Sequence, residues 1–337
     1  MEDNLKIGSL TLDNRIIVGP MAGISNYSFR SILKQFGPAL IYSEMISDKA
    51  ICFNNKKTLL MCEVQKEEKP IALQLFGHDV ETMVKAAKYM DEKTDCDTID
   101  INMGCPVPKV CRNNGGSSLM LDEDYAAELV SEIVKNIKKP LTVKVRAGWD
   151  HQHINVVSLS EKLSKTGIAA IAVHPRTRAQ YYSGHSDWDL IRQVKEKVDI
   201  PVIGNGDILS IEDYLKMKQD TNCDFFMVSR GTLGDPWLIE RLVHYDKYTE
   251  VLEKPSELEK LDQCLQHGQR LVALKGEKIG IKEMRGHACW YINGLPYANK
   301  VKAKINFMDT YEQFEKIIED YRMMIIKADF SELLSNS

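Results

Sequence analysis

The sequence predicts an α/β fold: a (β/α)8 TIM barrel followed by a small all-α helical bundle. Short apolar, β-branched runs alternate with longer amphipathic segments, which is typical of repeated βα units around a parallel sheet. Eight such runs occur before residue 246, the number that a barrel of this class requires. After residue 256 only helical patterns remain. We therefore predict a barrel domain at residues 1–246 and a helical domain at residues 247–337.

The strand candidates lie at residues 15–19, 39–43, 71–77, 98–102, 141–146, 169–174, 201–205 and 224–229. Amphipathic segments that start near residues 79, 122 and 210 are examples of the helices between them. A doubly wound open sheet is the alternative, but it does not need eight strands and usually carries its glycine fingerprint after the first one. The barrel is therefore favoured, with its last helix ending near Tyr245.

The C-terminal part is predicted to form helices at residues 256–276, 281–295, 298–308 and 310–328. Turn and cap residues predict breaks between them at Gly276, Gly280, Gly294 to Pro296, and Asp309. A small helical bundle is the natural arrangement of these segments.

The composition is that of an ordinary globular protein, with 44% hydrophobic and 27% charged residues. No apolar run reaches membrane-spanning length and the N-terminus lacks a signal-peptide pattern, so we expect a cytoplasmic protein with no membrane contact. The eight cysteines occur singly, without paired zinc-ligand spacing, so free thiols and no metal site are expected. A net charge of −4 means that any polyanionic partner must bind a local basic patch. No obligatory protein partner is indicated.

The predicted strands end in polar residues or glycine. In barrel enzymes the chemistry occurs at these ends. Residues two apart on a strand share a face, so such pairs could converge on one ligand above the barrel; the alternative is that they cap strands and pair with one another at the rim. Three pairs together favour a site: Asp100 with Asn102, Lys144 with Arg146, and His174 with Arg176.

The ends of the seventh and eighth strands are rich in small residues, "GNGDI" at 204–208 and "SRGTLG" at 229–234. Exposed backbone N–H groups at this place in a barrel form a common phosphate site. The two segments therefore predict a phosphorylated cofactor.

Several motifs together resemble the tRNA-dihydrouridine synthase family, and they are most similar to its bacterial branch of B type. They are "VGPMAGISNYSFR" (18–30), "LQLFG" (73–77), "IDINMGCPVPKV" (99–110), "VKVRAGWD" (143–150), "VHPRT" (173–177), "GNGDI" and "SRGTLGDPW" (229–237). The resemblance continues through "IKEMRGHACWYINGLP" (281–296), so it covers nearly the whole chain.

The resemblance implies an FMN-bearing barrel, a helical tRNA-binding domain, and NADPH (or NADH) as the reductant. One departure from the family is Ser229, where glycine is usual; a positive φ there would strain a serine. By position, the implied FMN contacts are Pro20, Met21, Ala22, Gln74, Lys144 and His174. Its phosphate would lie on Asn205, Gly206, Asp207, Ser229, Arg230 and Gly231.

Cys105 matches the catalytic acid of the family. The implied reaction reduces the C5=C6 bond of uridine, with a hydride from flavin N5 to C6 and a proton from Cys105 to C5. A thiol of ordinary pKa, roughly 8.5, is mostly protonated at neutral pH and can serve as that acid. The alternative is a buried packing cysteine, which is the commoner role of an isolated thiol. The polar, glycine-rich sequence around Cys105, with a possible hinged lid at 113–118, favours the catalytic role.

Further residues are predicted to contact the substrate. Asn102 would bind the uracil edge, Arg146 would stabilise developing negative charge beside Lys144, and Arg178 would reach the base or a phosphate. Residues 275–304 hold seven basic and two acidic residues, which predicts a tRNA contact, although such a run is usually only a solvated helix face. The predicted contacts in this segment are Lys282, Arg285, Lys300, Lys302 and Lys304.

Two other functions remain open from the sequence. An FMN barrel oxidoreductase of the dihydroorotate dehydrogenase kind would explain the flavin contacts and a loop cysteine, but leaves the basic helical segment unused. A catalytically inactive RNA-binding protein would explain that segment, but predicts a colourless protein without flavin.

Overall fold

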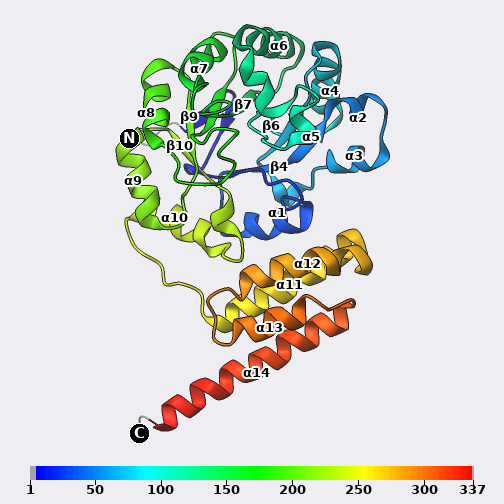
Figure 1. Ribbon diagram of the computed structural model, residues 1–337, viewed down its shortest axis with the longest axis vertical. Coiled ribbons are helices and arrows are strands. Elements are labelled where there is room, and N and C mark those ends of the chain that lie inside the picture. Colours follow the sequence, from blue (N-terminus) through cyan, green and yellow to red (C-terminus); the bar gives the residue numbers. More distant parts are fainter. Residues whose placement is uncertain (1–4, 336–337) are drawn as a thin grey trace.

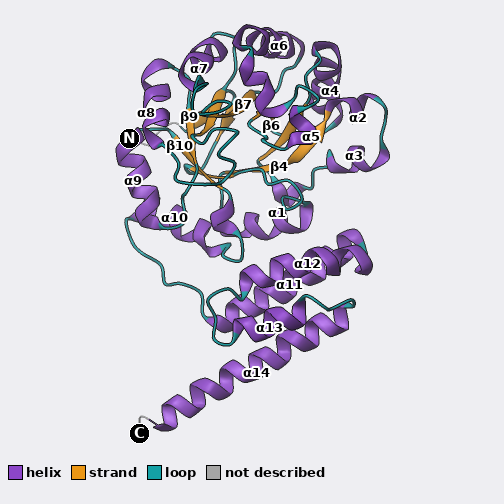
Figure 2. Ribbon diagram, in the orientation of Figure 1, coloured by secondary structure: helices purple, strands orange, loops and turns teal. Residues whose placement is uncertain are grey.

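The computed structural model describes residues 5–335, and it confirms the predicted barrel. Eight parallel strands form a closed barrel in the order β10-β3-β4-β5-β6-β7-β8-β9 (Figure 2). They are β3 (Ile16–Val18), β4 (Leu40–Ser47), β5 (Ile71–Phe76), β6 (Thr98–Met103), β7 (Leu141–Arg146), β8 (Ala170–His174), β9 (Val202–Asn205) and β10 (Phe225–Val228).

Helices surround the barrel (Figure 1). They are α1 (Tyr27–Leu33), α2 (Asp48–Cys52), α3 (Lys56–Met61), α4 (Val80–Lys93), α5 (Pro108–Cys111), α6 (Glu123–Asn136), α7 (Val156–Ser164), α8 (Trp188–Lys197), α9 (Ile211–Thr221) and α10 (Trp237–Tyr248). Four 3-10 turns complete this part: η1 (Lys34–Phe36), η2 (Lys66–Glu68), η3 (Gly116–Leu121) and η4 (Arg230–Thr232). The last barrel helix therefore ends three residues beyond Tyr245, where Thr249 turns left-handed at φ 60°.

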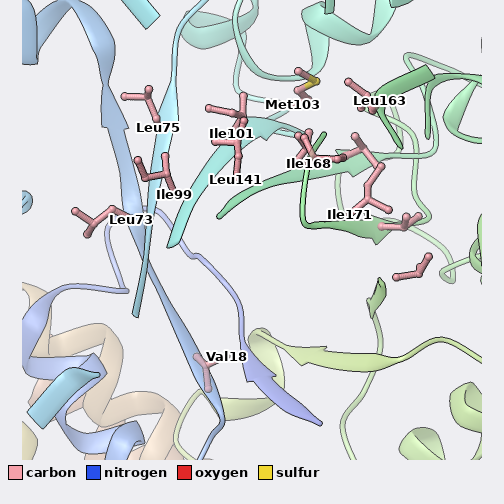
Figure 3. Close-up of a cluster of buried hydrophobic side chains, with 14 of the residues drawn as sticks. Val18, Leu73, Leu75, Ile99, Ile101, Met103, Leu141, Leu163, Ile168 and Ile171 are labelled. Carbon is pink, nitrogen blue, oxygen red and sulfur yellow. The ribbon is translucent and has the colours of Figure 1, made fainter. Parts of the chain in front are cut away.

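Alternation along each strand creates two apolar layers. Residues such as Leu73, Leu75, Ile99 and Ile101 point outward and belong to the core between strands and helices, part of which is drawn in Figure 3. The inward residues in the lower part of the barrel, away from the carboxyl ends of the strands, form a separate core, which includes Ile17, Tyr42, Ala72, Phe225 and Met227.

The lower end of the barrel is closed by an N-terminal hairpin, β1 (Lys6–Ile7) and β2 (Leu10–Thr11). Ile7 and Leu12 from this hairpin region pack into the inner core. Apolar side chains dominate this inner core, and the polar inward residues Gln74, Asn102 and Lys144 lie above it, nearer the ends of their strands. The open end of the barrel is therefore the end at which strands finish, as the fold class requires.

The C-terminal part consists of α11 (Glu257–Lys275), α12 (Glu277–Tyr291), α13 (Ala298–Ile305) and α14 (Tyr311–Ser335), which share their own apolar core. The predicted helix break at Gly280 is wrong, because this glycine lies inside α12. A Cβ on Gly280 would lie 2.9 Å from the Leu271 carbonyl oxygen and the Val272 Cα. The glycine thus permits close packing of α12 on α11 instead of ending a helix.

The helical part contacts the barrel through α11 and α12 against α1, as Figure 1 shows below the barrel. The Arg270 guanidinium donates to the Ser31 hydroxyl at 3.0 Å. The Phe29 ring lies 6.0 Å from each of two buried histidine rings, His267 and His287. Within residues 5–335, no helix is both long and apolar enough to cross a membrane.

Candidate active site

A cleft opens at the strand ends and contains about 990 Å³ of space free of protein atoms. Every residue predicted to contact the cofactor lines this cleft, and so do Asn102, Cys105 and Arg146. The cleft forms because consecutive strands deliver residues of the same alternation to one end of the barrel.

The loops after β9 and β10 form one wall of the cleft. Gly206 has φ 117°, and a Cβ there would lie 2.4 Å from the Ser186 Oγ. Within residues 5–335, the backbone N–H groups of Gly206, Asp207, Arg230 and Gly231 donate no intramolecular hydrogen bond. A cradle of free N–H groups beside the Arg230 guanidinium fits a phosphate group.

The side chain of Asp207 has a different role from its backbone. Its oxygens accept hydrogen bonds from Arg176 at 2.9 and 2.7 Å and from the Ser186 N–H at 2.8 Å, and Arg230 lies at 3.2 Å. Burial acts to raise the pKa of Asp207, but the bonds from Arg176 and Ser186 outweigh it and lower the pKa. These bonds engage the Arg176 guanidinium, and Arg176 does not line the cleft. The sequence pattern predicted it there together with His174, two residues earlier in the chain.

Ser229 does not show the strain that a positive φ would cause. Its φ is −123° and its ψ is −90°, so its backbone does not enter the left-handed region that favours glycine. The hydroxyl lies 3.5 Å from the Asn205 Nδ2 and therefore joins the loops that follow β9 and β10.

Lys144 and His174 present contrasting charges to the cleft. Burial, then repulsion from Arg146, lowers the pKa of Lys144 to about 8, while Asp100 opposes the shift. Within residues 5–335, the Lys144 ammonium makes no hydrogen bond or salt bridge. Burial and the surrounding cations hold the pKa of His174 well below its usual value, so this ring is neutral at pH 7. An ammonium with no hydrogen-bond partner among the described residues fits an electron-rich ligand group.

Cys105 follows β6 and lines the cleft with 8% of its surface exposed. Burial raises the pKa of its thiol, which is therefore protonated at neutral pH. The backbone holds it tightly: its N–H donates to the Asn102 Oδ1 at 2.8 Å, and its carbonyl accepts from the Ser117 N–H at 3.1 Å. The predicted lid at 113–118 packs directly behind it, where a Cβ on Gly116 would lie 2.8 Å from the Cys105 carbonyl oxygen.

Arg146 connects two loops at the cleft. Its Nε donates to the Gly104 carbonyl at 2.8 Å, and its Nη1 donates to the carbonyls of Thr177 and Tyr181 at 3.0 and 2.8 Å. With 3% of its surface exposed, this guanidinium is fixed in place beside the thiol. The charge is consequently preorganised and does not depend on a ligand for its position.

Sequence reasoning missed several cleft residues, notably Met45 and Tyr182. Met45 enters the cleft because β4 runs to Ser47, past a register shift between Tyr42 and Met45 that periodicity does not reveal. The Tyr182 ring lies 4.6 Å from the Arg230 guanidinium and 5.5 Å from that of Arg146. The adjacent tyrosines of "RAQYYSG", just after a strand end, were the available signal for this residue.

The other predicted substrate residues lie outside the cleft. Arg178 packs on the Trp149 ring at 4.5 Å. Arg285 donates to the Met308 carbonyl and pairs with Asp309 at 2.8 Å, so its charge is largely used within the helical part. Lys302 donates to the Asn293 side chain, whereas Lys282, Lys300 and Lys304 are exposed. Across residues 5–335 no cluster of histidine, cysteine and carboxylate side chains has the arrangement of a metal site.

Comparison with known proteins identifies consistent relatives. The dihydrouridine synthase (Dus) family model matches residues 16–326. A probable tRNA-dihydrouridine synthase of Rickettsia bellii is 39% identical over 323 residues, which cover 95% of this chain and 99% of the relative. The tRNA-dihydrouridine synthase B of Pseudomonas aeruginosa is 35% identical, with 90% of this chain and 91% of that protein covered.

Solved structures support the fold. The histamine dehydrogenase of Rhizobium sp. 4-9 matches with a TM-score of 0.54 at 14% identity, covering 84% of this chain and 50% of that one. The old yellow enzyme homologue of Zymomonas mobilis matches with a TM-score of 0.50 at 13% identity, covering 77% and 95%. At such identities the likeness extends to the fold alone.

Proposed function

Because the chain belongs to the dihydrouridine synthase family, we propose that it is a tRNA-dihydrouridine synthase that uses FMN and NADPH (or NADH). The proposed reaction reduces the C5=C6 bond of uridine in tRNA. The observation that carries it is a protonated, nearly buried thiol, Cys105, in the same cleft as the residues that would hold a flavin.

The cleft residues fit FMN in charge and shape. The free N–H groups of Gly206, Asp207, Arg230 and Gly231 would hold its phosphate, and the Lys144 ammonium would balance negative charge on its ring system. The loop of Pro20, Met21 and Ala22, together with Gln74, His174, Asn205 and Ser229, would complete the contacts. When bound and reduced, FMN supplies a hydride from N5 to C6 of the uracil.

Cys105 would hold the proton that C5 receives. A raised pKa keeps the thiol protonated at neutral pH, as a general acid requires. Arg146, fixed to the Gly104 carbonyl, would stabilise negative charge that develops on the uracil oxygens. The Asn102 Nδ2 donates one N–H to Gln74, and its second N–H would bind the edge of the uracil. A base inside folded RNA must leave its stack to reach this cleft.

The helical part would hold the tRNA, with the exposed Lys282, Lys300 and Lys304 as its main phosphate contacts. Lys302 and Arg285 would contribute less, because side chains of the protein already accept their hydrogen bonds. Arg178, stacked on Trp149, would meet the RNA at the barrel rim.

The test is reoxidation of the NADPH-reduced protein by bulk tRNA that lacks dihydrouridine, followed by mass spectrometry of the nucleosides. We expect a yellow protein, oxidation by tRNA, and new dihydrouridine. Rapid oxidation by orotate or by free uridine, with no reaction of tRNA, would favour a small-molecule oxidoreductase. A colourless protein that binds tRNA without modifying it would favour an inactive RNA-binding role.

A further inference from the structure

Asp100 is a fully buried carboxyl that lies beneath the cleft and not in its lining. It sits on β6, paired in register with Gln74 on β5 and Thr142 on β7. Removing an ionisable group from water is unfavourable unless its oxygens are hydrogen-bonded. The contacts of Asp100 therefore indicate why a carboxyl occupies this position.

A continuous chain of hydrogen bonds leads from Asp100 to the thiol-bearing loop. The Gln74 Nε2 donates to the Asp100 Oδ2 at 2.7 Å, and the Asn102 Nδ2 donates to the Gln74 Oε1 at 2.7 Å. The Asn102 Oδ1 then accepts from the backbone N–H of Gly104 at 3.1 Å and of Cys105 at 2.8 Å. All three side chains are at least nine-tenths buried, so water does not compete for these bonds.

The backbone end of this hydrogen-bond chain fixes which atom donates in each bond. Backbone N–H groups of Gly104 and Cys105 can only donate, so an oxygen of Asn102 must face them. The Asn102 Nδ2 therefore faces the Gln74 Oε1, which leaves the Gln74 Nε2 to donate to the Asp100 Oδ2. The two amides between these ends consequently have one orientation that satisfies every group.

We propose that Asp100 is a positioning residue for Cys105: through Gln74 and Asn102 it fixes the backbone that carries the thiol. The inference rests on the proposed function, because it assumes that Cys105 donates the proton. A misplacement of about 1 Å in a reacting group can lower a rate by roughly 10²-fold, so such positioning has a measurable effect.

Replacements at Asp100 separate this role from simple packing. Asp100→Leu keeps the branched outline of the side chain, with two larger methyl groups in place of the oxygens, but offers no oxygen to Gln74, which frees both amides to rotate. Asp100→Asn can still turn its oxygen towards Gln74 and its nitrogen towards Thr142, so it should restore most of the function. Thr142→Val is the matched control, because it removes the 2.6 Å bond on the other side of Asp100 and leaves the chain to Cys105 intact.

The first measurement is the single-turnover oxidation of reduced protein by tRNA. Asp100→Leu should slow this step by roughly 10- to 100-fold. Asp100→Asn and Thr142→Val should stay within roughly three-fold of wild type. Oxidation of NADPH with oxygen as acceptor does not need the thiol, so Thr142→Val should retain it within roughly two-fold. Asp100→Leu also releases Gln74, a proposed cofactor contact, but it should lose several-fold less in this reaction than in the oxidation by tRNA. Equal losses in both reactions of Asp100→Leu would overturn the positioning role.

The second measurement is a double-mutant cycle with Cys105→Ala. If Asp100 acts through Cys105, Asp100→Leu should have little further effect once the thiol is absent. Full additivity would mean that Asp100 acts on something else, and the inference would be wrong. If Cys105→Ala itself reduced tRNA at the wild-type rate, Cys105 would not be the proton donor and the inference would fall with it. The proposed function fails separately, when the reduced wild-type protein is not oxidised by tRNA at all.

The third measurement does not depend on activity. Amide hydrogens of Gly104 and Cys105 should exchange slowly in the wild-type full chain, and roughly ten-fold or more faster in Asp100→Leu, by peptide mass spectrometry. If Asp100→Leu does not fold, the smaller Asp100→Ala replaces it. Fast exchange of both amides in the wild-type protein would overturn the inference without any variant.

Discussion

The barrel mouth and the helical part both gather positive charge, but they hold it in opposite ways. Arg146 is buried and bonded to backbone carbonyls, and Lys144 is half-buried, with a pKa lowered first by burial and then by Arg146. Lys282, Lys300 and Lys304 extend into solvent from α12 and α13. A fixed, dry charge acts strongly on one nearby atom, whereas mobile surface charge attracts a polyanion over a longer range and is screened by salt. The two regions are thus suited to different steps of one reaction.

The largest effect is expected at the barrel mouth, from Cys105→Ala. Loss of a positioned general acid typically lowers a rate by roughly 10² to 10⁴-fold, so tRNA reduction should fall by that factor while flavin absorbance is retained. Single-turnover oxidation by tRNA measures the rate. Cys111→Ala is the matched control, because this buried thiol lies six residues further along the chain, at the end of α5, and donates to the Cys105 carbonyl at 3.4 Å. An unchanged rate in Cys105→Ala would identify another proton donor.

Which residues line the cleft at the barrel mouth was largely predictable from the sequence, because the pattern that places them there is local. Strand periodicity placed Gln74, Asn102, Lys144 and His174 on the inward face, and all four line the cleft. Neighbouring strands of a barrel bring such residues together without any knowledge of loop geometry.

What the sequence could not predict depends on partners distant along the chain. Arg176 faces Asp207, 31 residues later, rather than a ligand. Arg285 is bonded to Asp309 and the Met308 carbonyl, which removes much of its availability to RNA. The sequence predicted a helix break at Gly280 because glycine disfavours helices, but the close packing of α12 on α11 outweighed that local preference. Charge and propensity alone do not reveal such contacts.

The joint between the two regions should make stability depend on pH. His267 and His287 are buried between α1, α11 and α12, with ring centroids 4.3 Å apart. Burial, followed by His287 and Arg270, holds the pKa of His267 well below its usual value, and burial followed by Lys275 lowers the pKa of His287 to about 4. The folded protein therefore prefers neutral rings, whereas the unfolded chain binds protons below pH roughly 6.5.

Stability contributed by these neutral rings is present above pH 6.5 and is lost as the pH falls towards 4. For His287 alone, the free energy of unfolding should fall by about 2 kcal/mol between pH 7 and pH 5. Urea unfolding of the wild type and of His287→Phe at the two pH values measures this, and the variant should show a shallower dependence. His151→Gln, at an exposed site on the barrel, is the control. An equally steep dependence in His287→Phe would place the titrating group elsewhere.

The smallest effect is expected at the exposed lysines of the helical part. Neutralising Lys282, Lys300 and Lys304 to glutamine should weaken tRNA binding roughly ten-fold at moderate salt, because every lysine that no longer pairs with a phosphate also reduces counterion release. The slope of log affinity against log salt should fall by roughly 1 for each such lysine.

The control for the lysines is the same change at Lys85, Lys88 and Lys93, which lie on α4 of the barrel and away from the helical part (Figure 1). NADPH oxidation with oxygen as acceptor should be the same in both triple variants, because neither set lies near the cleft. If tRNA affinity falls equally in the two triple variants, the attraction comes from total charge and not from the helical surface. If tRNA affinity falls only in the variant of the helical part, and the reaction rate at saturating tRNA is unchanged, the exposed lysines act in binding and not in chemistry. That is the expected result, because the exposed charges attract the RNA whereas the fixed charges of the barrel mouth act on the reacting base.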